Sequence, residues 1–394
     1  MGQLSLADNP PPFVILGNPD SPRIHSFQAA LMGLGLAPAM VIAYQNWLTT
    51  PQILDQVLTP QSILRIESPG RNFLVEKLIL ARGAEAAAAE ASPWIDAASA
   101  LDLPEEPGRI RYPRQWYLGF WQVLIQLQTQ IATVGISQCL NSPLEIPILF
   151  DKIRCQTLFG HHQIPIPPPL GTVTCFDELI ARLQVTGCRR VFIKLAHGSS
   201  ASGVMALALQ GSKIKAWTTV EVVAEGPTLQ LYNSRRIQEY QDLPTLAAII
   251  DQLCRERVQV EAWVPKASFH QHSCDIRVVV IEGEARQAVV RLSKSPMTNL
   301  HLQNKRCPPD ALIERMGKVA WEQALHPCEQ VARLFPQSLQ VGVDVAILSD
   351  YCRAIILEAN AFGDLLPNVT WRGLDTYTTE LLTILGQPLP TDVL

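Results

Sequence analysis

Near its C-terminal end the chain reads Val341-Gly-Val-Asp-Val-Ala-Ile-Leu348 and then, after a short gap, Ala354-Ile-Ile-Leu-Glu-Ala-Asn-Ala361. Both runs are dominated by Val, Ile, Leu and Ala, which is typical of buried β-strands. The polar residues between them, Ser349–Arg353, predict a turn, so the two strands form a hairpin. An acid or an amide inside such an apolar strand needs a specific partner, and this hairpin contains three of them.

The expected register of the hairpin brings these three polar residues together. With the turn centred on Tyr351, Asp344 lies directly opposite Glu358, and Asn360 lies two residues further on the same face. Because opposed buried carboxylates repel, the pattern predicts a divalent cation between them. Carboxylate and carboxamide oxygens suit Mg²⁺ or Mn²⁺, and the absence of nearby His or Cys argues against Zn²⁺. Salt-bridged surface residues are the alternative.

A second pattern places a lysine at the end of a strand. Val191-Phe-Ile-Lys194 is followed by a loop of small residues, Gly198–Gly203, which includes Ser199 and Ser200. Small side chains let backbone N–H groups approach an anion, and Lys194 supplies a positive charge. The GK[ST] ending of a P-loop is missing. An ordinary flexible hairpin is the alternative.

A third pattern gathers charges on one strand face. A three-residue loop at Glu282–Glu284 puts Asp275, Arg277 and Arg291 on the same side of a second hairpin. Arginines beside carboxylates can hold phosphate oxygens bidentately. An Asp–Arg salt bridge on a solvated face is the alternative.

The N-terminal part predicts a βαβ unit. Phe13–Gly17 and Ala39–Tyr44 are apolar strands, and Arg23–Leu34 has its apolar residues at helical spacing. Such a unit implies a parallel sheet with ligand sites at the carboxyl ends of its strands, where the loop Asn18–Arg23 lies.

Three segments link this unit to the rest. Gly83–Ala100 is rich in Ala and Glu and predicts a surface helix, and Leu103–Gly108 predicts an exposed linker. Arg111–Gln130 carries the crowded aromatic cluster Trp116–Trp121, which fits either a buried helix between domains or a platform for substrate.

The composition of the chain limits the classes of function that it can have. The chain has 394 residues, of which 47% are hydrophobic and 17% charged, enough for two or three domains. The 32 basic and 36 acidic residues give a net charge of −4, which argues against nucleic-acid binding. We find no membrane span and no secretory signal. The nine cysteines form no CxxC pair, which predicts reduced thiols and a cytoplasmic protein.

Together these patterns resemble the ATP-grasp enzymes, and most of all the RimK-like ligases. The resemblance covers about residues 145–370 and rests on motifs in the family's order: Asp151-Lys152, Lys194 with the small-residue loop, Glu261-Ala262-Trp263-Val264, Asp275-Ile-Arg277, Arg291, and Asp344 with Glu358-Ala-Asn360. It implies an α/β and α+β fold, in which a βαβ domain with a parallel sheet precedes a two-lobed ATP-grasp fold. The expected limits are 1–110 for the first domain, 111–150 for a helical linker, 151–260 for the small lobe and 261–394 for the C-terminal lobe.

The resemblance also implies roles. Lys152, Lys194 and the loop Gly198–Gly203 would hold the phosphates of ATP. The backbone of Glu261–Val264 would bind adenine, and Glu261 would approach the ribose or the amine edge. Asp275 would help to bind the nucleotide. Arg277 and Arg291 would reach the γ-phosphate and the acyl phosphate. Mg²⁺ or Mn²⁺ would be bound by Asp344, Glu358 and Asn360.

The implied activity is an ADP-forming ligase that joins a small-molecule or peptide carboxylate to an amine or a thiol. A kinase that phosphorylates a hydroxyl, for which Lys305-Arg306 is the only hint, and a non-catalytic ATP-binding protein are the alternatives. Relatives are often oligomers, so a homo-oligomer is possible. The sequence departs from the family after Asn299, where Asn304-Lys305 replaces an expected Gly pair. Asp364 is a further candidate beside the substrate.

Overall fold

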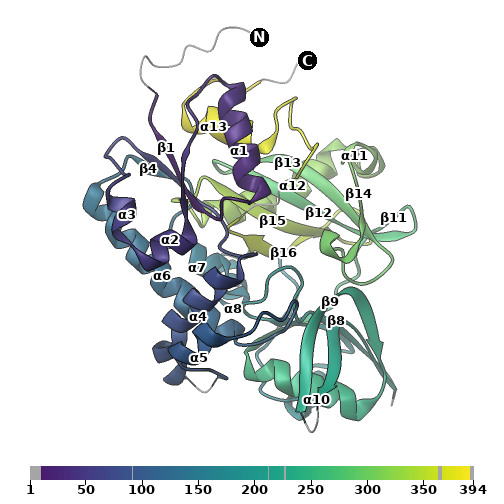
Figure 1. The fold of residues 1–394 in the computed structure, drawn as a ribbon. Coiled ribbons are helices and arrows are strands. Elements are labelled where there is room, and N and C mark those ends of the chain that lie inside the picture. The colour runs from purple at the N-terminus through teal and green to yellow at the C-terminus, as the bar shows by residue number, and fades with distance from the viewer. Residues whose placement is uncertain (1–9, 91, 212, 226–227, 363–365, 391–394) are drawn as a thin grey trace.

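The computed structural model describes residues 10–390 except 91, 212, 226–227 and 363–365. Three β-sheets organise these residues. In Figure 1 the first sheet lies at the left in purple and blue, the second at the lower right in teal and green, and the third at the upper right in green and yellow. The three parts adjoin near the centre, so a site built from all of them is possible.

The first sheet is parallel. Its order is β2 (Met40–Ala43), β1 (Phe13–Gly17), β3 (Ile63–Ile66) and β4 (Gln138–Cys139). Helix α1 (Pro22–Gly33) joins β1 to β2, and it begins there because Ser21 accepts a hydrogen bond from Arg23 N and Pro22 fits the first turn. The predicted βαβ unit is therefore confirmed. Short helices α2 (Tyr44–Thr49) and α3 (Gln52–Asp55) follow β2.

The second sheet is antiparallel and has its own core. Its order is β5 (Pro169–Gly171), β10 (Val258–Ala262), β6 (Arg190–Leu195), β7 (Met205–Gln210), β8 (Lys213–Glu225) and β9 (Thr228–Tyr240). Helices α9 (Phe176–Thr186) and α10 (Leu243–Arg255) pack on one face, where Val191 and Ile193 are buried. Because side chains alternate along a strand, Phe192 and Lys194 point to the other face.

The third sheet carries the two predicted hairpins. Its order is β14 (Lys305–Cys307), β13 (Glu284–Ser293), β12 (His272–Ile281), β15 (Gln340–Ile347) and β16 (Ala354–Asn360), with β11 (Ser268–Phe269) paired to β12. Asp344 stands opposite Glu358, as predicted, and Asp275 stands opposite Arg291, which keeps these charges on one face. The predicted three-residue loop is wrong, because Ile281 pairs with Glu284. In each hairpin a register shift between the turn and the acid produces the observed pairing. Helices α11 (Asp310–Met316) and α12 (Lys318–Arg333) cover one face, and the 3-10 turn Leu300–Leu302 precedes β14.

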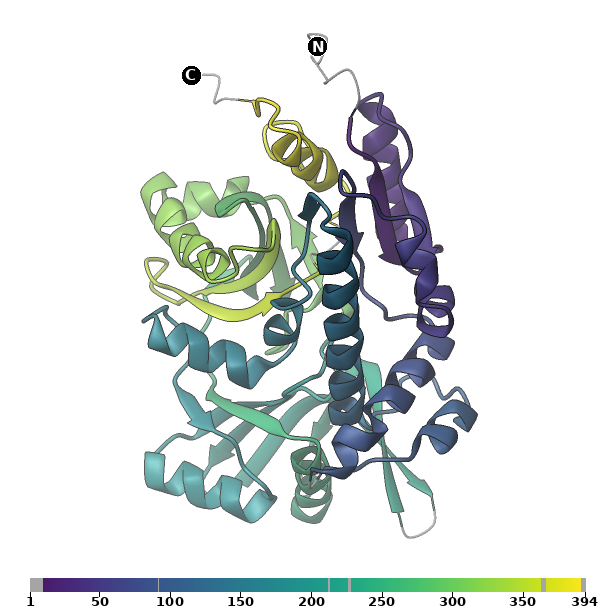
Figure 2. The same cartoon turned by 90° about the vertical axis from the view of Figure 1, so that its left-hand side faces the viewer.

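One core runs from the first sheet to the third. It passes through α6 (Pro113–Val134), α7 (Ile146–Leu149) and α8 (Lys152–His161). Figure 2 shows α6 as the long dark-teal helix that runs from beside the parallel sheet down to the second sheet. Phe120 is buried in this core, and Tyr117 is buried in a small separate cluster with Ala87 and Leu118, which confirms the interpretation of the aromatic segment as a buried helix. Helix α13 (Thr376–Ile384), which we did not expect, packs on α1.

The predicted surface helix needs correction. The helix is α4 (Phe73–Ala88), and its Gly83 is buried against α6; a Cβ on Gly119 would lie 1.9 Å from Ile79 O. This close helix contact replaces the expected exposed face. The predicted linker Leu103–Gly108 follows α5 (Ala97–Asp102) without helix or strand and is mostly exposed, as expected. Its end is attached to β9, because Asn233 N donates to Gly108 O at 2.6 Å.

Two further expectations can be compared with the structure. All nine cysteines are free thiols, as the sequence predicts. Among the described residues, none of the helices has the length and apolar character needed to cross a bilayer. The cytoplasmic location, the oligomeric state and the domain limits stay predictions.

Candidate functional site

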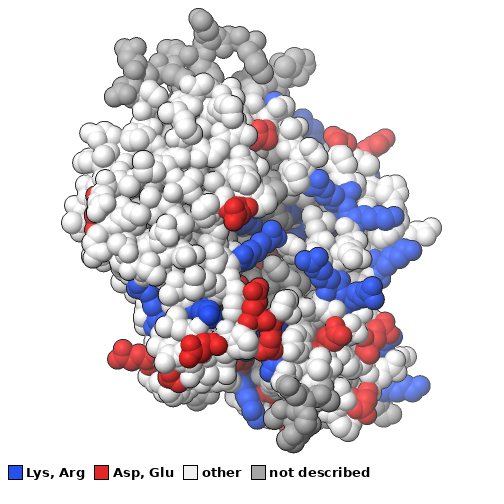
Figure 3. Space-filling view, viewed as in Figure 1, with Lys and Arg blue, Asp and Glu red and all other residues white. Residues whose placement is uncertain are grey.

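A cleft of about 660 Å³ lies where the three parts of the chain adjoin. All the predicted site residues line it except Gly203 and Trp263. Figure 3 shows basic and acidic side chains next to one another around the hollow at the centre of this face. Residues from three separate sheets therefore meet in one site.

Lys152 connects two walls of the cleft. Asp151 caps α8 by accepting from Ile153 N and Arg154 N, and this cap fixes where Lys152 leaves the helix. Lys152 Nζ lies 2.8 Å from Glu358 Oε1 and donates to Gly198 O at 2.7 Å. The lysine thus stands between the small-residue loop and the predicted metal ligands.

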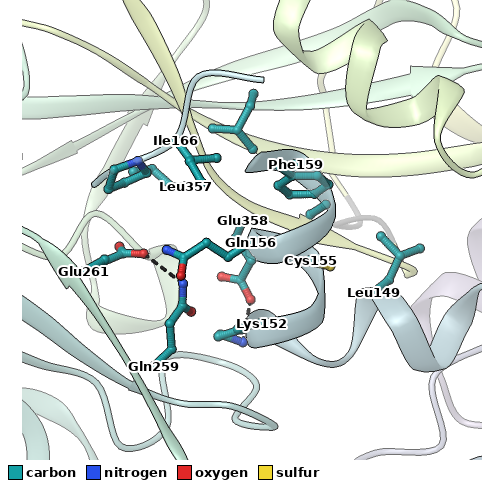
Figure 4. A pocket seen from close by; sticks show the side chains of 13 residues that line it. Leu149, Lys152, Cys155, Gln156, Phe159, Ile166, Gln259, Glu261, Leu357 and Glu358 are labelled. Atoms are coloured by element: carbon teal, nitrogen blue, oxygen red, sulfur yellow. Dashed lines mark hydrogen bonds and ion pairs between the residues drawn. The ribbon is translucent and has the colours of Figure 1, made fainter. Parts of the chain in front are cut away.

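Lys194 and Glu261 form a second ion pair on the open face of the second sheet. Their strands β6 and β10 are antiparallel neighbours, and Lys194 Nζ lies 2.5 Å from Glu261 Oε1. Gln259 Nε2 also donates to Glu261, at 3.3 Å. Figure 4 shows Gln259, Glu261, Lys152 and Glu358 at one end of a small adjoining cavity, with apolar side chains such as Phe159 at the other.

The predicted linker strand has most of its N–H groups in use. Ala262 N donates to Pro168 O and Trp263 N to Arg190 O, both at 2.9 Å. The Trp263 ring packs against Phe192, with ring centroids 5.6 Å apart, and does not line the cleft. Val264 does line it.

The small-residue loop is a tight turn. Ser200 and Gly203 have φ angles of 52° and 66°, and Ser202 N donates to Ser199 O at 2.8 Å. A Cβ on Gly203 would lie 2.6 Å from Leu195 Cδ1, so only glycine fits there. Gly203 shapes the loop from behind, whereas Gly198, Ser199 and Ser200 face the cleft.

The third sheet contributes a buried charge network. Arg291 Nε donates to Asp275 Oδ1 at 2.7 Å, and Arg291 also lies 3.1 Å from Asp344 Oδ1. Arg277 donates to both oxygens of Asp344, at 3.0 Å for Oδ2. Burial opposes ionisation, yet the arginines hold the pKa of Asp275 and Asp344 below the usual range. Both acids are therefore carboxylates.

Sequence reasoning missed two members of this network. Lys266 Nζ lies 3.1 Å from Asp275 Oδ2, and it donates to Thr298 Oγ1 at 2.9 Å. Thr298 in turn donates to Asp275. The position of Lys266, two residues beyond the linker strand, was the signal that could have identified it.

The predicted metal residues share one edge of the cleft. Asp344 and Glu358 are cross-strand partners, and Asn360 Nδ2 donates weakly to Gly342 O at 3.4 Å, which leaves the amide oxygen for a ligand. Among the described residues no group of three His, Cys, Asp or Glu side chains forms a ready metal cluster. Two carboxylates and one amide oxygen nevertheless fit a hard divalent cation.

A buried cluster behind the loop was also missed. His197 Nε2 lies 3.3 Å from Asp151 Oδ2 and 3.2 Å from Arg114 of α6, and its ring stacks on Tyr117. Burial lowers the pKa of His197, although Asp151 opposes this. Glu90 holds Arg114 through two hydrogen bonds of 2.6 and 2.7 Å. The cluster connects the helix of Lys152 to the small-residue loop.

The far end of the cleft is formed by the first sheet and by the loop before β14. Arg23 and Arg71 line it from the carboxyl ends of β1 and β3, and Asn299 and Arg306 line it from the other side. Asp364 lies outside the described residues. The predicted loop at the end of β1 therefore reaches the site.

Comparisons with known proteins find similarity in the fold and none in the sequence families. No protein-family model and no curated protein matches the chain. Solved structures do match this chain, and three examples match it along nearly their whole length. The ATP-grasp ligase PsnB, complexed with a phosphomimetic variant of its minimal precursor, Mg and ADP, is 15% identical, with a TM-score of 0.52, and the match covers 96% of this chain and 98% of that one.

The other two structures give similar values. The macrocyclase MdnC, bound with the precursor peptide MdnA from Microcystis aeruginosa MRC, is 10% identical with a TM-score of 0.51, covering 95% of this chain and 99% of that one. The D-cycloserine synthetase DcsG is 13% identical with a TM-score of 0.50, with the same two coverages. All three sheets are thus part of the likeness.

Proposed function

Since the chain has the ATP-grasp fold, we propose that it is an ATP-dependent ligase that joins a carboxylate to an amine or a thiol with the help of Mg²⁺ or Mn²⁺. The observation that carries the proposal is one cleft in which Lys152 and Lys194 face the opposed carboxylates Asp344 and Glu358. Cations and metal-binding acids side by side fit a polyphosphate, because phosphoryl transfer needs both.

The contacts favour one orientation of the nucleotide. Lys152, Lys194 and the loop Gly198–Gly203 hold the phosphates, and Glu261 approaches the ribose or the amine edge. Because Ala262 and Trp263 use their N–H groups within the sheet, Val264 is the linker residue whose N–H we assign to adenine. Asp344, Glu358 and Asn360 hold the metal.

The proposed chemistry has two steps. An oxygen of the substrate carboxylate attacks the γ-phosphorus of ATP, and ADP leaves. The nucleophile then attacks the carbonyl carbon of the acyl phosphate, the carbon–oxygen bond to phosphate breaks, and the nucleophile releases its proton. Arg277 and Arg291 stabilise the negative charge that develops on the transferring group. Asp275 holds Arg291 in place for this role.

Calorimetric titration of ATP tests the site, with and without Mg²⁺, on the wild type and on Glu358→Ala with Asn360→Ala. We expect magnesium-dependent binding that the double substitution abolishes. Asp350→Ala is a matched control, because Asp350 is an acid in the turn of the same hairpin. ATP binding that ignores both the metal and the substitutions would put the metal site elsewhere.

The products separate the proposed ligase from its two rivals. ADP with free phosphate means ligase, ADP with a phosphorylated acceptor means kinase, and no turnover with any acceptor means a binding protein. PsnB and MdnC are described with precursor peptides and DcsG as a D-cycloserine synthetase. We therefore propose peptide as well as small-molecule acids and amines for the first screen.

A further inference from the structure

A second hollow, of about 730 Å³, lies on the second sheet beside the nucleotide cleft. It is formed where β6 and β8 begin and where β7 and β10 end, and it shares only Ala262 with the cleft. The roles proposed above do not use it. We call it the basic hollow and define it by Arg189, Arg190, Lys213, Lys215, Trp217 and Trp263.

Its charge is strongly positive for a chain of net charge −4. Arg189, Arg190 and Lys213 are exposed, and within the described part of the chain none of the three has an ion-pair partner. Lys215 is the exception, because its Nζ lies 2.7 Å from Glu239 Oε2. Three unpaired cations around one hollow favour an anionic ligand.

The aromatic residues indicate which class of anionic ligand fits the hollow. Lys215 lies over the Trp217 ring, 4.7 Å from its centroid, and Arg190 lies 5.5 Å from that of Trp263. The two rings meet edge to face at 5.8 Å and 82°, and Trp217 Nε1 donates to Glu239 at 2.7 Å. A nucleobase needs an open ring face on which to stack. These rings are already engaged by cations and by one another, which disfavours a nucleic acid.

The floor of the hollow supplies an apolar contact instead. Ala208 lies between Arg190 and Lys215 in the register of β6, β7 and β8, and Leu209 and Ala262 also line the hollow. We propose that the basic hollow binds an acidic peptide segment that also carries apolar side chains. Its carboxylates pair with Arg189, Arg190 and Lys213, and an apolar side chain rests against the floor. This proposal is independent of the ligase chemistry, because it needs no nucleotide.

Fluorescence anisotropy with a labelled synthetic peptide tests the proposal. The probe is a short peptide of glutamates with two phenylalanines, and the same peptide with glutamine at every glutamate is its neutral counterpart. The test variant is Arg189→Glu with Lys213→Glu. The matched control is Arg255→Glu with Lys318→Glu, two exposed cations, of which Arg255 lies on α10, against the opposite face of the same sheet. Far-ultraviolet circular dichroism and urea unfolding show whether every variant is folded.

We expect the acidic peptide to bind the wild type and the control alike. Because each exposed ion pair contributes modestly, reversing two charges should weaken binding by roughly tenfold or more, and added salt should weaken binding to the wild type. Equal binding of the test variant, equal binding of the neutral peptide, or no binding at all would overturn the proposal. Preferential binding of an oligothymidylate would overturn it in favour of a nucleic acid, and charge-dependent self-association in favour of a second copy of the chain.

Discussion

Replacing Lys152 with methionine removes one ammonium group from the phosphate end of the cleft and keeps most of the side-chain volume. A unit charge about 4 Å from a phosphate oxygen contributes about 4 kcal/mol at an effective dielectric constant near 20. The lysine side chain is 13% exposed, and in the proposed complex a phosphate would replace Glu358 as its partner. We therefore expect a net loss of about 2–3 kcal/mol, which raises the Kd for ATP by about 30- to 140-fold.

Titration calorimetry with two ligands distinguishes a phosphate contact from a general defect. Affinity for ATP should fall, whereas affinity for AMP, which lacks the β- and γ-phosphates, should change little. The free energy of unfolding in urea should change by about 1 kcal/mol or less, because Glu358 is 27% exposed. Lys318→Met is the control for loss of a charge. An ATP affinity within threefold of the wild type, or an equal loss for AMP, would refute our assignment of Lys152.

Three further substitutions test the packing and the buried charges. Asp275→Asn should lower the free energy of unfolding by about 3–5 kcal/mol at pH 7, because it removes the carboxylate that pairs with Arg291 and leaves the buried Lys266 without its acid. Arg291 holds the pKa of Asp275 below its ordinary 3.8. The stabilisation by the Asp275 carboxylate is therefore present above pH 3.8 and is lost as the pH falls through the lower pKa of the folded state. Urea unfolding curves of the wild type and the variant that stay equally far apart in acid would contradict this. Gly119→Ala should cost about 1–3 kcal/mol or more, because its Cβ would meet Ile79 O at 1.9 Å, whereas Gly33→Ala, with nothing within 4 Å, should be neutral or mildly stabilising in the same thermal or urea assay. Burial raises the pKa of Glu256 from 4.5 to about 7, so the folded state disfavours its charged form, and the stability gained by Glu256→Gln should grow by about 2 kcal/mol between pH 5 and pH 8; a gain that does not vary with pH would be inconsistent with this cause.

The third sheet could be predicted from the sequence because two independent signals agree there. Side-chain alternation fixes which residues share a face, and short turns fix the register. Asp344 opposite Glu358 and Asp275 opposite Arg291 agree with those two rules, although each hairpin also contains a register shift near its turn that neither rule predicts. The same holds for the βαβ unit at the N-terminus, whose helix has a serine cap and a proline at its start.

The missed features depend on contacts between distant segments, which local pattern does not encode. The Ala- and Glu-rich composition of the segment from Gly83 onward favours a solvated helix, yet Gly83 and Gly119 allow two helices to approach until backbone touches backbone. His197 and Arg114 are 83 positions apart and meet only because α6 passes behind the small-residue loop. Lys266 differs, because it lies only nine positions before Asp275 and its place just after the linker strand could have identified it.

The ion pairs of the cleft bear on the order in which the metal and the nucleotide would bind. Glu358 is neutralised by Lys152, Asp344 by Arg277, and Glu261 by Lys194, so each acid already has a cation from the chain itself. A free divalent ion would have to displace a lysine or an arginine from its acid. The displaced side chain would then have no counter-charge. A nucleotide brings its own phosphates as new partners for the displaced cations. If the proposed function holds, we expect metal and nucleotide to enter as one chelate, in an exchange of partners that conserves charge, and the chain to discriminate that chelate from the bare ion.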